Sequence, residues 1–200
     1  MKKMEFIEAL TNRRSVYSID KKIKIQEKEI VEILEEAVLN TPSAYNSQSQ
    51  TVVLLLNEHH DKLWDLVKQE IKKLVKPEDF VKSEQKINNF KAGYGTVLFF
   101  DDGEITEGLT KKFPLYKDNF LKWSIEQNGM LQGNVWVGLE TLGLGASLQH
   151  YNELIEKQVM SWLDLPEKWN LTAQMPFGNL LEHPDPKPKK SIDLRLKIFK

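Results

Sequence analysis

The sequence predicts a single α+β domain spanning residues 1–200, and two observations carry that prediction. Apolar residues recur with helical spacing in several segments, and short runs of consecutive apolar residues between them are typical of buried strands. These segments alternate without an internal repeat or a long linker, which favours one mixed architecture. At 200 residues and 40% hydrophobic content, the chain is large enough to bury one core.

The first half of the chain combines amphipathic helices with strongly apolar strands. Helices are expected at 4–12, 26–39, 57–74 and 78–91, and strands at 51–56 and 93–100. Asn57 is placed to cap the third helix, and Pro77 separates it from the fourth. Both strands are apolar throughout, so we expect them near the middle of a sheet.

The second half contains a long helix and shorter elements. Helices are expected at 104–111, 117–142 and 153–163, and strands at 146–151, 171–177 and 194–199. The last strand alternates apolar and charged residues at the very end of the chain. It must therefore pair with the sheet of its own subunit or with that of a neighbour.

The helix expected at 117–142 is apolar on nearly every side, so protein must surround it. Gly129, Gly133 and Gly138 each lower its intrinsic stability by up to ~1 kcal/mol relative to alanine, but they let another helix approach closely. A chain of this length covers all sides of such a helix more easily with a second copy. We interpret the helix as a dimer core, and the alternative is the central helix of a monomer.

Composition excludes several classes of function. The formal net charge of −1 gives no general attraction to nucleic acid or to an anionic membrane. Cysteine is absent, which excludes disulfides, thiolate metal sites and thiol nucleophiles and fits a reducing compartment. The sequence contains neither a signal-peptide pattern nor an apolar run long enough to span a membrane. We therefore expect a cytoplasmic protein.

Three kinds of catalytic or cofactor-binding motif find no support in this sequence. Gly143-Leu-Gly145 follows a predicted helix and lacks the third glycine of a dinucleotide fingerprint. His59 and His60 are adjacent and point about 100° apart on a helix, so we expect solvated residues rather than a metal site. No Gly-x-Ser-x-Gly elbow is present to supply a serine nucleophile.

Two polar segments remain as candidates for ligand binding. Arg13, Arg14 and Ser15 follow the first helix and can grip a phosphate, and Lys187 and Lys189 on a proline-rich segment can complete such a cradle. The uncharged loop 41–50 offers neutral donors and acceptors. Taken separately, these are ordinary surface charges and an ordinary connection. Taken together, they suit a flat ligand with a phosphate and a neutral polar edge, the shape of flavin mononucleotide (FMN).

The same segments resemble those of the FMN-dependent nitroreductase family. The resemblance rests on Arg-Arg-Ser-Val-Tyr at 13–17, Pro-Ser-Ala-Tyr-Asn-Ser-Gln at 42–48 and the C-terminal proline-lysine segment. Together with Ser-Leu-Gln-His-Tyr-Asn at 147–152, they are most similar to the fatty-acid-repression-mutant subgroup. The resemblance covers essentially the whole chain in element order.

The resemblance implies a fold and a site. The fold is a central mixed or antiparallel sheet surrounded by helices, in an interlocked homodimer with a long interface helix and two FMN molecules between the subunits. The implied FMN-binding residues come from both subunits and from both ends of the chain: Arg13, Arg14, Ser15, Tyr17, Pro42, Ser43, Ala44, Asn46, Gln48, Gln149, His150, Tyr151, Lys187 and Lys189. No catalytic side chain and no metal is implied, because the flavin carries the chemistry.

The implied activity is oxidoreduction. NADH or NADPH delivers two electrons to the flavin as hydride, and a nitroaromatic or quinone then removes them in a ping-pong sequence. One alternative is a flavin-binding regulatory or stress-response protein of low turnover, as the subgroup name suggests for lipid signalling. Another is a helical interaction module without a cofactor.

Overall fold

The computed structural model describes residues 5–200, so Met4, the first residue of the first predicted helix, lies outside the described residues. The helices are α1 (Phe6–Asn12), α2 (Glu27–Asn40), α3 (Asn57–Leu74), α4 (Pro77–Lys91), α5 (Gly103–Lys112), α6 (Lys117–Thr141) and α7 (Asn152–Leu163). The strands are β1 (Ile19–Asp20), β2 (Gln50–Leu56), β3 (Gly95–Asp102), β4 (Leu144–Ala146) and β5 (Trp169–Leu180).

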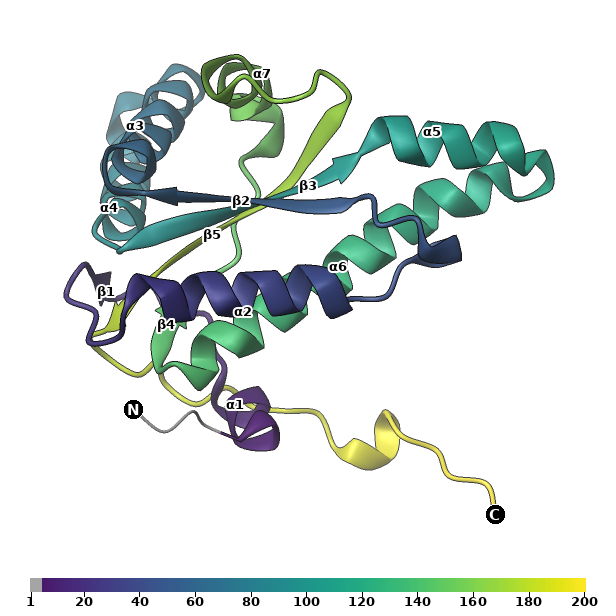
Figure 1. The fold of residues 1–200 in the computed structure, drawn as a ribbon. Coiled ribbons are helices and arrows are strands. Elements are labelled where there is room, and N and C mark those ends of the chain that lie inside the picture. The colour runs from purple at the N-terminus through teal and green to yellow at the C-terminus, as the bar shows by residue number, and fades with distance from the viewer. Residues whose placement is uncertain (1–4) are drawn as a thin grey trace.

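A central antiparallel sheet separates two helical layers (Figure 1). Its strand order is β1-β5-β3-β2, and β4 also pairs with β5. Successive side chains of β3 point to opposite faces, so Val97 and Phe99 pack against α2 and α6, whereas Leu98 and Phe100 pack against α3, α4 and α7. This confirms the α+β class and the central sheet surrounded by helices.

The strand predicted at 146–151 is mostly wrong. Strand β4 ends at Ala146, and only an isolated bridge between Gln149 and Gln174 follows it. The reason lies in the Gln174 side chain, whose Oε1 accepts the backbone N–H of Tyr151 at 2.7 Å. The N–H of Tyr151 is therefore bonded to a side chain and not to the backbone of β5, so regular strand pairing stops.

The strand predicted at 194–199 is also absent from the described chain. A 3-10 helix at Ile192–Leu194 replaces its start, and Lys197 Nζ donates to the carbonyl of Asp193 at 2.8 Å. The tail extends away from the body of the molecule, and Phe199 is 94% exposed (Figure 1). An alternating pattern requires a neighbouring strand, and the chain's own sheet supplies none here.

Helix α6 matches the predicted long helix to within one residue, but its two halves differ. The C-terminal half packs on the chain's own sheet, and a Cβ added to Gly138 would collide with Ile33 of α2. Along the N-terminal half, Leu121 and Ile125 are exposed, and a Cβ added to Gly129 would meet nothing. Helix α6 has 25 residues, yet neither it nor any other helix of residues 5–200 combines the length and the hydropathy of a membrane span.

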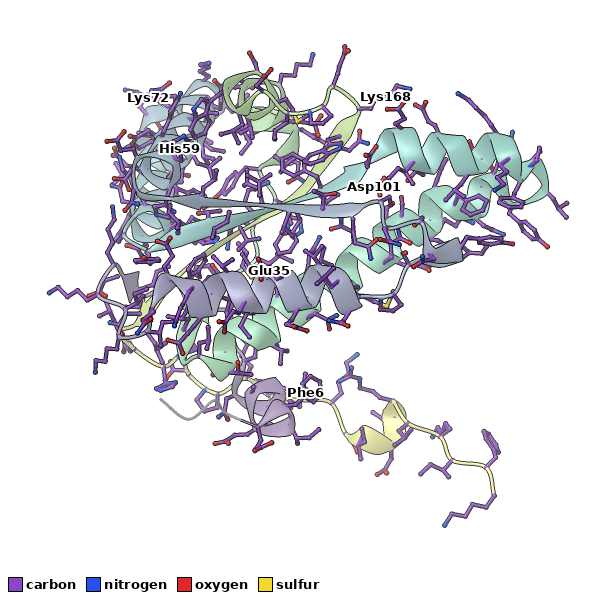
Figure 2. The ribbon with its side chains drawn as sticks, viewed as in Figure 1. Phe6, Glu35, His59, Lys72, Asp101 and Lys168 are labelled. Carbon is purple, nitrogen blue, oxygen red and sulfur yellow. The ribbon has the colours of Figure 1, made fainter. Side chains whose placement is uncertain are left out.

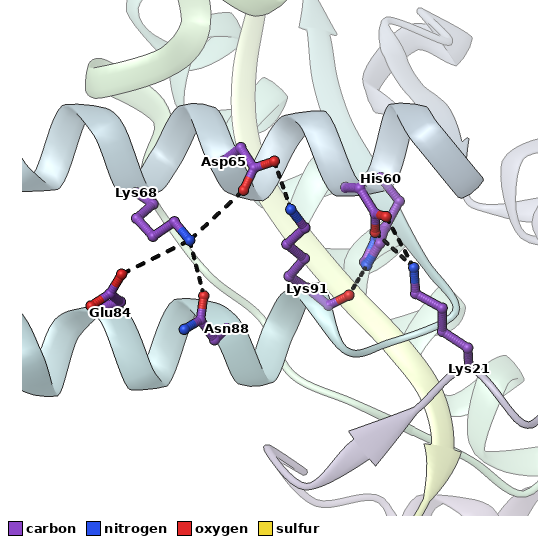
Figure 3. Close-up of polar contacts among 8 residues, drawn as sticks. Lys21, His60, Asp65, Lys68, Glu84, Asn88 and Lys91 are labelled. Carbon is purple, nitrogen blue, oxygen red and sulfur yellow. Dashed lines mark hydrogen bonds and ion pairs between the residues drawn. The ribbon is translucent and has the colours of Figure 1, made fainter.

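The two adjacent histidines have opposite environments, so the prediction that both are solvated is wrong for His60. His59 is exposed, whereas His60 is fully buried between α3 and the end of α4 (Figure 3). His60 Nε2 lies 3.1 Å from the carbonyl of Lys91, and Nδ1 lies 2.9 Å from Thr96 Oγ1. Nε2 faces a carbonyl and therefore carries the ring hydrogen, and burial keeps the imidazole neutral, so Nδ1 accepts from Thr96, whose oxygen also accepts from the indole of Trp64.

Asn57 also departs from its predicted role. It is the first residue of α3 with a φ of 50°, and Leu56 occupies the cap position without a side-chain hydrogen bond. Asparagine tolerates this left-handed conformation better than most residues, which explains its place at the sharp turn from β2 into α3.

Burial of His60 makes stability depend on pH. Burial lowers its pKa from 6.5 to about 4, so between these values the unfolded chain binds a proton that the folded chain does not. The free energy of unfolding should therefore fall by up to about 3 kcal/mol as pH drops through this window. Urea titrations should show this loss in the parent and in His59→Gln, but not in His60→Gln. Equal pH dependence in all three proteins would contradict the assignment.

Candidate functional site

The basic cluster after α1 is fixed to the core by its backbone. Helix α1 ends at Asn12, and the chain then becomes extended. Ser15 forms a parallel bridge with Ala146, and the N–H of Val16 donates to the carbonyl of Ala146 at 2.9 Å. These bonds hold the segment beside the end of α6 and β4, so its arginines start from a fixed position.

The two arginines are held in different ways. The guanidinium of Arg13 lies 4.4 Å from the ring centroid of Trp136 on α6, a cation–π contact. Arg14 donates through Nη2 to the carbonyl of Asp185 at 2.6 Å, which ties the N-terminal cluster to the C-terminal segment. Both guanidinium groups keep donors available because each has five N–H bonds.

A cavity of about 570 Å³ lies between the end of α1 and the C-terminal segment. Its cationic side chains are Arg13, Arg14, Lys187 and Lys189, and none of the described residues that line it is acidic. Prolines alternate with the lysines and stiffen the segment that carries them. The predicted N- and C-terminal basic residues therefore meet in one concave, positively charged site that suits an anion such as a phosphate.

The predicted residues Tyr17, Gln149, His150 and Tyr151 do not line this cavity, although Tyr17 lines a smaller one beside Ser15, and the four differ in accessibility. Gln149 is buried, and its Nε2 donates to Ser147 Oγ at 3.1 Å, so its amide is engaged within the chain. His150 is exposed and Tyr151 is half-buried. Burial raises the pKa of the Tyr151 hydroxyl, and the nearby Tyr17 adds to this effect. The Tyr151 phenol is therefore neutral at pH 7.

The remaining predicted residues lie elsewhere in the chain, on the loop between α2 and β2. This loop sits beside the N-terminal half of α6, whereas α1 lies near the opposite end of that helix (Figure 1). The loop carries Pro42, Ser43, Ala44, Asn46 and Gln48, of which the proline, Asn46 and Gln48 are exposed. Within one chain, the predicted site thus falls into two separate groups.

The backbone of this loop is unusual. Tyr45, Asn46 and Gln48 all have positive φ angles of 52–56°, a region that costs residues other than glycine roughly 1 kcal/mol or more. Internal bonds hold the shape, including that from the N–H of Gln48 to Ser43 Oγ at 2.9 Å. A strained loop of this kind persists only when its surroundings fix it.

A buried polar cluster that sequence analysis missed lies beneath the loop. Ser49 Oγ donates to Asp101 at 2.6 Å, and Thr106 Oγ1 donates to the other oxygen of that carboxylate at 3.0 Å. Gln127 of α6 donates to Ser49 Oγ at 2.7 Å and accepts the N–H of Ala44 at 2.9 Å. Asp101 lies where β3 ends and α5 begins (Figure 2). Burial raises its pKa, and the two hydroxyl donors oppose that shift.

An aromatic group adjoins the same loop and was also missed. The ring of Tyr45 lies 4.9 Å from that of Phe113 and 5.3 Å from that of Phe120, measured between centroids. It stacks on Trp123 at 6.4 Å. A cavity of about 280 Å³ lies between the loop and α6, with Tyr45 and Trp123 in its wall. Such a cavity suits a small flat ring.

A metal centre has no support in the described part of the chain. No group of three or more histidine, aspartate or glutamate side chains within residues 5–200 is arranged to hold a metal ion. Both ring nitrogens of His60 make hydrogen bonds inside the protein and are not available to a metal ion. The described side chains therefore offer an anion site, a polar loop and an aromatic cavity.

The antiparallel sheet between two helical layers, with a long helix connecting a cationic cavity to a polar loop, is the nitroreductase-like fold. The chain belongs to the Nitroreductase family, whose sequence model matches residues 10–179. This membership places it among the oxidoreductases.

Relatives of known name support the assignment over almost the full chain. The HBN1 protein of Saccharomyces cerevisiae is 33% identical over 96% of both chains, and the nitroreductase FRM2 of the same yeast is 31% identical over 86% of both. Nitroreductase CinD of Lactococcus lactis, solved in complex with chloramphenicol, is 37% identical with a TM-score of 0.89, covering 98% of this chain and 100% of its own. The yeast matches confirm the subgroup resemblance.

Proposed function

We propose that the protein is an FMN-dependent oxidoreductase that passes two electrons from NADH or NADPH to nitroaromatic or quinone acceptors in a ping-pong sequence. The observation that carries the proposal is a cavity lined by four cationic side chains and, within residues 5–200, by no acidic one, in a chain of the Nitroreductase family. Arg13, Arg14, Lys187 and Lys189 would hold the phosphate of FMN there. When bound, FMN supplies the hydride chemistry.

Binding of FMN is also supported by a solved structure of this fold. An Exiguobacterium sibiricum protein of the same fold, 13% identical with a TM-score of 0.72, was solved in complex with FMN.

The acceptor class is supported by the second cavity. Tyr45 and Trp123 provide aromatic surface in its wall. CinD was also solved in complex with 4-nitrophenol, at 38% identity and a TM-score of 0.88. We propose that this chain accepts flat aromatic compounds of the same kind. Its own side chains bind and orient them, and none is assigned a nucleophilic role.

A homodimer would unite the two groups of site residues. Leu121, Ile125, Gly129 and Gly133 follow one another at four-residue intervals, so they share one exposed face of α6. An added Cβ would meet nothing at either glycine, so a partner helix can approach this face closely. We propose that the loop 42–48 of one subunit reaches the FMN gripped by the basic cavity of its partner.

The first prediction concerns electron transfer. Adding NADH or NADPH anaerobically to the FMN-loaded protein should bleach the visible flavin absorbance, and 4-nitrophenol or a quinone should then restore it. Initial rates at several acceptor concentrations should give parallel double-reciprocal lines, as a ping-pong sequence requires. Absence of bleaching with both nucleotides would favour a flavin-binding regulatory protein. Protein that stays colourless after exposure to FMN would favour an interaction module.

The second prediction concerns the basic cavity. Combining Arg13→Ala with Arg14→Ala removes two charge-assisted contacts to the phosphate, so FMN affinity should fall about a hundredfold while the dimer stays folded. Fluorescence titration gives the affinity, and circular dichroism checks the fold. The matched control, Lys111→Ala with Lys112→Ala on α5, removes equal charge and should bind FMN normally. Unchanged affinity in the arginine variant would remove these residues from the site.

The third prediction concerns the dimer. Gly129→Glu places a charge on the exposed face of α6, and burying it against a partner helix is costly. Light scattering should therefore find monomers, with helix content retained because the chain itself leaves the position open. Gly108→Glu on α5 is the matched control, since an added Cβ is equally unopposed there. A dimer that persists in Gly129→Glu would contradict the proposed interface.

A further inference from the structure

The loop 42–48 has a strained backbone, and α6 adds hydrogen bonds to those that the loop makes internally. Three of its residues have positive φ, and only short internal bonds oppose their strain. Helix α6 contacts the loop and Thr41, the residue before it, with two amide side chains about two turns apart, and therefore on one face. Asn134 donates to Thr41 Oγ1 at 2.7 Å, and Gln127 accepts the N–H of Ala44 at 2.9 Å.

Gln127 is the centre of this support. Its Oε1 accepts from Ala44, while its Nε2 donates to Ser49 Oγ at 2.7 Å and to Ser47 Oγ at 3.2 Å. The amide thus spans the loop from one end to the other. It is 3% exposed, so water does not readily replace these bonds.

The hydrogen bonds beyond Gln127 all lead toward the carboxylate of Asp101, which accepts at both of its oxygens. Gln127 donates to Ser49, Ser49 donates to Asp101, and the second oxygen of Asp101 accepts from Thr106. Because both carboxylate oxygens act as acceptors, the geometry fits the ionised side chain. Ser49 and Asp101 are 0% and 8% exposed, so the order of donors and acceptors is fixed by buried groups.

We propose that Gln127 and Asp101 are positioning residues that set the backbone of loop 42–48 for the flavin, without touching the flavin themselves. This inference rests on the proposed function, in which loop 42–48 of one subunit contacts the FMN held by its partner. The buried chain Asp101–Ser49–Gln127 fixes where the N–H of Ala44 points. The neighbouring Asn46 and Gln48 then present their amides from a backbone that does not rearrange on binding.

The direction of the hydrogen bonds makes the proposal testable. Gln127→Glu keeps an acceptor for Ala44 but loses the donor to Ser49, and it places a second carboxylate near Asp101. Asp101→Asn alone disturbs the other end of the chain. Together they restore it in reverse: the amide at position 101 donates to Ser49 Oγ, and Ser49 donates to the carboxylate at position 127. Gln127→Glu adds one negative charge and Asp101→Asn removes one, so the double variant has the same net charge as the parent.

Two measurements read the effect. FMN affinity should fall about tenfold in each single variant and return to within about twofold of the parent in the double variant. Amide hydrogen exchange at Ala44 in the flavin-free protein should follow the same order, fast in the singles and slow in the double. Gln132→Glu is the matched control: it makes the same change on α6 and loses its bonds to Asn128 and Thr172, away from the loop. Its FMN affinity should match the parent's.

The outcomes separate this proposal from the proposed function. A parent protein that binds no FMN overturns both. A parent that binds FMN, with single variants that bind it equally well, overturns the positioning role alone. If a single variant fails to fold, the double variant decides: recovery of folding and affinity supports the reversed chain, and loss of either contradicts it.

Discussion

The packing of α6 against the central sheet is the contact on which both parts of the site depend. Leu131, Val135 and Leu139 are fully buried in the core beside β3 and β5. Their packing fixes the rotation of α6 about its own axis and its position along the sheet. Trp136 then lies under Arg13, and Gln127 lies under the loop. At 1.5 Å per residue, these two supports are about 13 Å apart along one rigid axis.

Periodicity predicted the elements whose partners lie within the chain. Helix α2 and strands β2 and β3 formed where apolar spacing placed them, because each buries its apolar face on a neighbour of the same chain. The alternating tail at 194–199 did not form the predicted strand. A strand exists only when it pairs with another strand, and the sequence alone does not identify that partner. The segment 146–151 failed because a side chain, Gln174, took a backbone partner.

Residue type predicted one grouping that the structure bears on. Arg13 and Lys187 lie far apart in sequence, their charges suggested a shared phosphate cradle, and the structure brings them to one cavity, where the binding of phosphate stays a prediction. Asp101 and Gln127 were missed because polar residues beside apolar segments ordinarily face solvent. His60 was misassigned for the same reason, and only the fold shows what surrounds it.

The bond from Arg14 to the carbonyl of Asp185 joins opposite ends of the polypeptide, and this has a consequence for biogenesis. During synthesis the N-terminal arginines leave the ribosome long before the segment that carries Lys187 and Lys189. The cationic cavity is therefore complete only after β5 and the segment that follows it have emerged and docked. An anion that needs all four cations would bind after the sheet has assembled.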